Sequence, residues 1–170
     1  MHKGLGDIIP KLNLDGYRVA VETQAMLFPE WLTMVDVLTF SPKGPSSGNV
    51  VDPLPMMEWL RDGNHTGEVC IKIVVFTPED LDYALSVYNA MHPSLYQSFY
   101  ITVGTAPYDE DEFEHDKHGD VRTISVIMGM RNMVQEILNR VEMDQESLNE
   151  KFHVGCQQHV LLWPTEEKGK

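Results

Sequence analysis

The chain has 170 residues, 42% of them hydrophobic, and a formal net charge of −13 at pH 7. This length suits one core, so we expect a single domain over residues 1–163 and a polar tail over 164–170. The acidic balance argues against nucleic acid as a partner, because neutralising phosphates requires clustered Lys and Arg.

No apolar stretch approaches membrane-spanning length and no signal-peptide pattern opens the chain, so we expect a cytoplasmic protein without a membrane partner. Its two cysteines, Cys70 and Cys156, lie in separate contexts. They are too few for the cysteine set of an iron–sulfur cluster, and free thiols are expected in a reducing cytosol. The acidic run at 109–118 lacks a metal-ligand spacing, so we predict a solvated loop and no metal site.

Helical and strand patterns alternate along the first half of the chain. Polar, proline-rich and glycine-rich segments separate them, most clearly at 41–49 and 62–67. Thr77-Pro78-Glu79-Asp80 is typical of a helix start, with a cap, a proline and acids in the first turn. The patterns predict helices at 5–14, 31–35, 53–61 and 78–90, and strands at 18–23, 37–40 and 69–76.

The second half continues the alternation after one interruption. We predict a strand at 99–103, then the acidic segment 108–120, a long helix at 121–141, a short helix at 145–151 and a last strand at 153–162. Alternating helices and strands indicate an α/β fold with parallel strands joined by right-handed crossovers.

Polar residues follow the apolar bodies of the predicted strands. Glu22 and Thr23 end the first strand, Ser41-Pro42-Lys43 follows the second, and Gly104 follows the strand at 99–103. Ligands of α/β sheets sit beyond the carboxyl ends of parallel strands. We therefore predict that these ends line one nucleoside-sized hollow, with Gly104 permitting close backbone approach to a ligand.

Four stretches of the sequence are distinctive: Glu22-Thr23-Gln24, LTFSPKGPSSG at 38–48, IKIVVFTPEDL at 71–81 and QQHVLLW at 157–163. They resemble one enzyme family, 7-carboxy-7-deazaguanine synthase, a radical S-adenosylmethionine (SAM) lyase of queuosine biosynthesis. The resemblance spans most of the chain, patchily after Tyr108.

The family's three-cysteine cluster motif and its Gln-Gly-Glu and Gly-Gly-Glu-Pro segments do not occur in the sequence. The resemblance therefore implies the C-terminal two-thirds of the enzyme, from a truncated or split gene. The implied fold is a partial (β/α) barrel of the radical SAM type, whose N-terminal units are missing.

The resemblance also implies site residues. The cofactor contacts would come from two strand ends and the substrate contacts from the first and last strands. The implied SAM-binding residues are Ser41, Pro42, Lys43, Thr102, Val103, Gly104 and Thr105, and the implied substrate-binding residues are Glu22, Thr23, Gln157 and His159.

The implied function is to help in the radical ring contraction of 6-carboxy-5,6,7,8-tetrahydropterin. SAM would bind this chain, while the iron–sulfur cluster and magnesium would come through a partner. That partner would be the N-terminal half of the same enzyme, or a second copy, covering the open edge of strand 18–23. The alternative is a non-catalytic remnant or a binding or scaffold protein that keeps the fold. Whether the chain is an enzyme is therefore left open.

Overall fold

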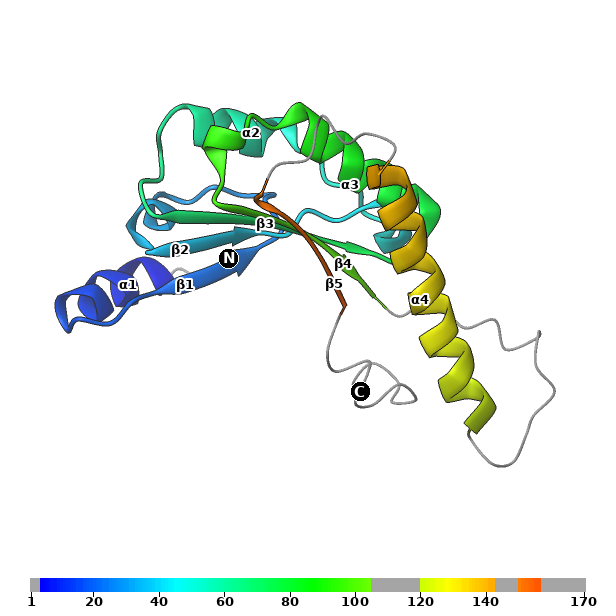
Figure 1. Cartoon of the computed structure of the whole chain (residues 1–170). Helices are drawn as coiled ribbons and strands as arrows, with labels where there is room; N and C mark the ends of the chain where they lie inside the picture. The colour runs from blue at the N-terminus through cyan, green and yellow to red at the C-terminus, as the bar shows by residue number, and fades with distance from the viewer. Residues whose placement is uncertain (1–3, 105–119, 143–149, 157–170) are drawn as a thin grey trace.

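The structure is a computed structural model that describes residues 4–104, 120–142 and 150–156, with only the backbone at 120–127 and 141–142. Helices and strands alternate along it (Figure 1). In chain order the elements are α1 (Leu5–Leu14), β1 (Ala20–Thr23), the 3-10 helix η1 (Glu30–Met34), β2 (Val37–Phe40), the 3-10 helix η2 (Pro45–Ser47), α2 (Leu54–Arg61), β3 (Glu68–Val75), α3 (Pro78–Ala90), the 3-10 helix η3 (Pro93–Leu95), β4 (Ser98–Val103), α4 (Asp120–Glu142) and β5 (Phe152–Cys156).

The strands form a five-stranded sheet in the order β1-β2-β3-β4-β5. Every neighbouring pair is parallel. A doubly wound sheet reverses its strand order at a switch point, whereas a (β/α) barrel adds each new strand beside the previous one. The consecutive order confirms the predicted α/β class and is compatible with a partial barrel.

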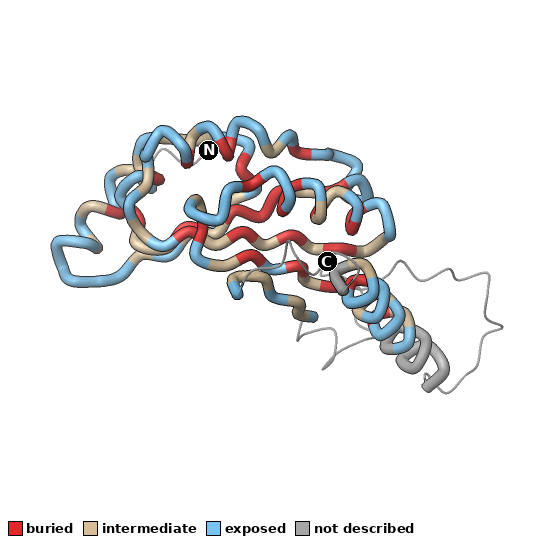
Figure 2. The backbone as a smooth tube through the Cα atoms, turned by 45° about the horizontal axis from the view of Figure 1, so that its top comes forward, coloured by how far each residue is buried: buried red, intermediate tan, exposed pale blue. Residues whose placement is uncertain are grey.

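One face of the sheet carries the core. α2 and α3 lie over this face (Figure 1), and buried residues alternate with more exposed ones along the strands (Figure 2). This alternation follows from the two-residue period of a strand. The strand side chains buried against the helices include Leu38, Phe40, Ile71, Ile73, Val75, Phe99, Ile101 and Val103.

The opposite face is polar and partly exposed, and no helix of the described ranges covers it. We call it the open face. It is formed by the alternate residues of the same strands: Glu22, Thr39, Cys70, Lys72, Val74, Tyr100, Thr102 and His153.

The order and type of the described elements agree with the sequence predictions. β1 begins at Ala20 rather than at residue 18, and the segment predicted as a helix at 31–35 is the 3-10 helix η1. The last strand is described only to Cys156, so residues 157–162, the short helix predicted at 145–151 and the tail 164–170 lie wholly or mostly outside the described residues.

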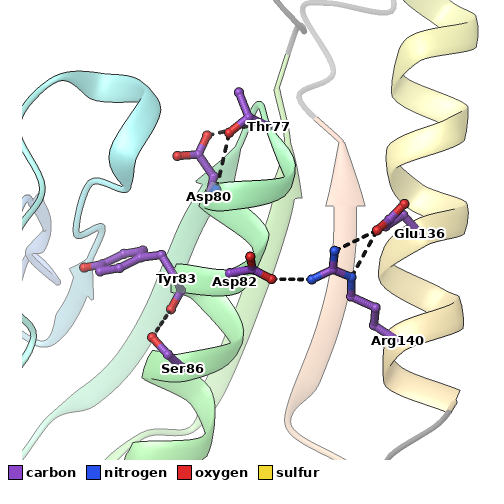
Figure 3. Close-up of polar contacts among 7 residues, drawn as sticks. All are labelled: Thr77, Asp80, Asp82, Tyr83, Ser86, Glu136 and Arg140. Carbon is purple, nitrogen blue, oxygen red and sulfur yellow. Dashed lines mark hydrogen bonds and ion pairs between the residues drawn. The ribbon is translucent and has the colours of Figure 1, made fainter.

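α4 is joined to α3 by charged side chains on the outside of the molecule. The Arg140 guanidinium donates to Glu136 on its own helix and to Asp82 on α3 (Figure 3). Hydrogen bonds to Glu136 and Asp82 raise the pKa of Arg140. None of the described helices combines the length and apolar composition needed to cross a lipid bilayer.

Candidate functional site

The carboxyl ends of the strands meet at one edge of the sheet because all strands run in the same direction. The Ser41 N–H donates to the Thr23 carbonyl at 2.7 Å, which extends the β1–β2 pairing beyond β2. The Gly104 N–H donates to the Val75 carbonyl at 2.9 Å in the same way. The segments that follow β2, β3 and β4 therefore begin side by side at this edge.

The loop at 41–49 is fixed to the start of α3 by Asp80, which is fully buried. Its Oδ1 accepts from the Ser46 N–H at 2.9 Å, and its Oδ2 accepts from the N–H groups of Phe76 at 2.9 Å and Thr77 at 3.2 Å. Thr77 and Asp80 also form the capping box of α3 (Figure 3). A carboxylate is favoured at a helix N-terminus, and its hydrogen bonds are charge-assisted. Asp80 therefore holds the loop against the sheet edge.

The loop also packs tightly where Gly44 meets α3. A Cβ on Gly44 would lie 2.7 Å from the Asp80 Oδ1, so no larger residue fits without a shift. At the end of the loop, the Tyr83 hydroxyl donates to the Val51 carbonyl at 2.7 Å. Burial, with a smaller contribution from Asp52, raises the pKa of Tyr83 to about 12. Contacts at both ends therefore determine the position of the loop.

Ser41 has a buried hydroxyl that is not used within the described residues. Its exposed fraction is 2%, and its Oγ has no hydrogen-bond partner there. Buried hydroxyls are normally paired, so an unpaired one needs an explanation. Alternation from Thr39 places Ser41 on the open-face side of β2. Pro42 is buried and Lys43 is partly buried.

Glu22 forms an ion pair with Lys72 on the open face. The Lys72 Nζ lies 3.1 Å from each carboxylate oxygen of Glu22, and the two residues come from β1 and β3. The side chains are 34% exposed for Lys72 and 51% exposed for Glu22. Lys72 was not among the predicted site residues. The signal that could have found it is its position as the one charge in an otherwise uncharged strand, 69–76.

A second pair on the open face was also missed. The rings of Tyr100 and His153 stack with centroids 4.8 Å apart and planes inclined by 27°. Lys72 is paired in register with Tyr100, and Tyr100 with His153. The polar band of the open face therefore runs from Glu22 on β1 to His153 on β5. The only signal for Tyr100 and His153 in the sequence is the alternation of side chains between the two faces of β4 and β5.

The remaining predicted residues lie in different surroundings. Thr23 ends β1 on the helix-facing side by alternation, and its carbonyl accepts the Ser41 N–H. Thr102 lies on the open face. Val103 is 1% exposed and faces the helices, which leaves its backbone as the part available to a ligand. Thr105, Gln157 and His159 lie outside the described residues, as does the acidic run at 109–118.

Gly104 has a packing reason that the sequence prediction did not include. A Cβ at this position would lie 2.3 Å from the ring of Phe76. The Phe76 ring occupies the space that a side chain would take, so packing by itself gives a reason for glycine here. That glycine also permits close approach to a ligand stays a prediction.

The described residues contain no group of three His, Cys, Asp or Glu side chains arranged to hold a metal ion. Cys70 and Cys156 are free thiols, and the pKa of Cys70 is raised chiefly by burial. An open hollow is lined by residues that include Arg18, Asp36 and Gln97. It lies at the amino ends of the strands, at the opposite end of the sheet from their carboxyl ends.

Comparison with known proteins identifies relatives of this chain. No protein-family model matches it. A protein of Bacillus subtilis named 7-carboxy-7-deazaguanine synthase is 31% identical over 164 residues, and one of Bacillus cereus with the same name is 25% identical over 166 residues. The chain is a homologue of 7-carboxy-7-deazaguanine synthases.

The resemblance predicted from the sequence is thereby confirmed. Each alignment covers 95% of this chain but 61% of the synthase. The chain thus spans less than two thirds of the length of these relatives, which is consistent with a C-terminal portion of a 7-carboxy-7-deazaguanine synthase.

Proposed function

We propose that this chain acts as the C-terminal part of a 7-carboxy-7-deazaguanine synthase of the radical SAM type and forms one side of its active site. In this role it binds SAM and the substrate during radical ring contraction of 6-carboxy-5,6,7,8-tetrahydropterin. The observation that carries the proposal is the loop Ser41-Pro42-Lys43. It is anchored at the carboxyl edge of a consecutively wound parallel sheet, in a chain homologous to these synthases.

The cofactor side of the site consists of the carboxyl ends of β2 and β4. The Ser41 hydroxyl, which has no partner among the residues that the structure describes, is suited to a ribose or carboxylate oxygen, because a hydroxyl both donates and accepts. The Lys43 ammonium complements the cofactor's carboxylate, and Pro42 restricts the backbone between them. Thr102 adds a hydroxyl from β4, while Val103, Gly104 and Thr105 contribute backbone groups or close the pocket.

The substrate side uses the open face. The Glu22 carboxylate accepts hydrogen bonds from ring N–H groups of the pterin. Thr23, whose side chain is on the helix-facing side, contributes from the end of the same strand. Gln157 and His159, which follow β5 in the sequence, complete the substrate contacts. These residues bind and orient the pterin in a site from which the sheet excludes water on one side.

The iron–sulfur cluster and magnesium belong to the complementing part of the enzyme. Two cysteines do not supply a cluster's ligands, and the cluster provides the electron that starts the radical chemistry. Whether the complementing part is joined to this sequence or is a separate chain, it pairs with β1. Within the described ranges, β1 pairs only with β2. An open parallel edge is a template for another strand.

Apolar side chains near β1 support this position of the complementing part. Large hydrophobic residues are exposed on α1, on the turn after it and just after β1, among them Ile8, Leu14, Tyr17, Met26 and Leu27. Clustered exposed apolar residues mark interaction surfaces. The free thiols of Cys70 and Cys156 suit a reducing compartment, so we propose the cytoplasm as the location.

The test is reconstitution. The chain is co-expressed with the part of the Bacillus subtilis relative that the alignment leaves uncovered, and the complex is purified and analysed for iron. We expect a complex that cleaves SAM to 5′-deoxyadenosine under reduction and forms the deazaguanine product, detected by mass spectrometry. The matched control is the same complex with Ser41→Ala and Lys43→Met, which should weaken SAM binding without loss of iron.

A complex that carries the cluster but neither binds SAM nor forms product would contradict the proposal. That result would favour the alternative, a non-catalytic remnant or scaffold. The cysteine count favours this alternative if no cluster-bearing part exists. A stable homodimer with β1 paired to β1 would contradict the proposed position of the complementing part, and gel filtration with light scattering reveals it.

A further inference from the structure

We propose that Lys72 is a positioning residue that orients the Glu22 carboxylate toward the substrate. The inference rests on the proposed function, because it deepens the role of Glu22 in that site. The residues next to Lys72 on β3, Ile71 and Ile73, belong to the core. Lys72 itself is not one of the predicted site residues.

The location of Lys72 is unusual for a strand in the middle of a parallel sheet. β3 is the central strand, and Val69, Ile71, Ile73 and Val75 point into the core. When both faces of a parallel sheet are covered by helices, its central strands are apolar on both sides. A lysine at the centre of the open face therefore indicates that this face meets a polar surrounding or a ligand.

The geometry restricts the Glu22 carboxylate. The Lys72 Nζ contacts both oxygens at 3.1 Å and reaches from β3 across β2, on which Thr39 lies opposite Glu22. An ammonium placed between the two oxygens limits rotation of the carboxylate group. The carboxylate oxygens together offer about four lone-pair sites, so acceptors remain for a ring N–H of the substrate. Half of the Glu22 side chain is exposed, which leaves these acceptors accessible.

The pair contributes little to folding. Exposed ion pairs are weakened by solvent and by the entropy of ordering two long side chains. Both side chains are much more exposed than the core residues that face the helices. Lys72 can therefore be replaced with little change in stability, and a change in catalysis reports on the site rather than on the fold.

The experiment uses the reconstituted synthase and steady-state kinetics. Lys72→Met should raise the KM for the carboxytetrahydropterin about tenfold, the size typical of a coupled pair, and Lys72→Arg should restore most of it. Substrate-free SAM cleavage should stay within about twofold of the wild type, since Lys72 does not serve the cofactor. Because Lys72 acts through Glu22, Lys72→Met should add less than about twofold to the KM of Glu22→Gln.

A matched control comes from a second exposed ion pair. Arg18 lies 3.8 Å from Glu68 at the amino ends of the strands, and their side chains are 74% and 50% exposed. Arg18→Met removes a comparable charge pair far from the proposed site and should leave the KM unchanged. Urea unfolding of each variant confirms folding, and Lys72→Gln replaces Lys72→Met if that variant fails to assemble.

The outcomes separate the two proposals. If the wild-type complex forms no product, the proposed function fails and the role of Lys72 fails with it. If the wild type is active and Lys72→Met has wild-type kinetics, only the inference is overturned. If the effects of Lys72→Met and Glu22→Gln on the KM are independent, so that their free energies add in the double variant, Lys72 contacts the substrate by itself. The positioning role is then overturned.

Discussion

The two faces of the sheet are made from the same strands but differ in burial and polarity. On β4, Phe99 is fully buried and its ring contacts those of Tyr88, Tyr96 and Phe152, whereas the next residue, Tyr100, is exposed and stacks on His153. The helix-facing side supplies the apolar burial that stabilises the fold. The open face carries the ion pair of Glu22 with Lys72 and the stacked rings of Tyr100 and His153. Adjacent residues therefore differ in how much they contribute to stability, and variants of neighbouring positions test this difference.

The largest difference is expected between Phe99→Ala and Tyr100→Ala. Removing a buried phenylalanine side chain costs about 3–5 kcal/mol, because apolar contacts are lost and a cavity remains. Tyr100→Ala loses a partly exposed stack, for which about 1 kcal/mol is expected. Urea unfolding followed by circular dichroism gives both values. Equal losses would show that the open face also belongs to the core.

Asp80→Asn should have the next largest effect, about 2–4 kcal/mol, because the variant removes the buried charge to which three backbone N–H groups donate. The freed loop should also become a substrate for trypsin after Lys43. The control is Asp82→Asn on the same helix, where the carboxylate is exposed and pairs with Arg140. Comparable loss in both variants would argue against a special role for the buried carboxylate.

Gly104→Ala should cost about 1–3 kcal/mol, since the added methyl group collides with the Phe76 ring. Phe76→Leu provides space, so the double variant should recover part of the loss. The measurement is again the free energy of unfolding. Failure of Phe76→Leu to rescue would show that the collision with the Phe76 ring is not the cause of the loss.

The smallest effect is expected from the ionisation of Tyr83, which changes the free energy of unfolding only at alkaline pH. Its pKa is raised from 10.0 to about 12 in the folded protein, so the neutral form is favoured there. The stability that this supplies is complete below the unfolded-state pKa and is lost as the pH rises toward 12. The stability of the wild type should therefore fall more steeply than that of Tyr83→Phe across this range. Parallel curves of stability against pH for the two proteins would contradict the raised pKa of Tyr83.

The sequence predicted those elements whose signals are local. Thr77-Pro78-Glu79-Asp80 indicates the start of α3, because a cap, a proline and acids act within one turn. The abrupt polar ends of strands 37–40 and 99–103 indicate where the sheet edge lies. These features need no information from distant residues.

The contacts of the site could not be predicted in the same way, because they join residues far apart in the chain. Glu22 and Lys72 are separated by 50 positions and meet only through the register of three strands. Asp80 was assigned to a helix start, yet it also holds Ser46, 34 positions earlier. The packing reason for Gly104 was missed because the ring that fills the space beside it comes from Phe76, at the end of a neighbouring strand.

The consecutive order of the strands has a consequence for synthesis on the ribosome. Each strand from β2 onward pairs with the strand made immediately before it, so its partner has already left the exit tunnel. Growth of the sheet then follows translation from one end to the other. Paired residues from β1 to β4 lie 17 to 31 positions apart, which favours rapid pairing, whereas β5 pairs with β4 across 53 positions and joins last.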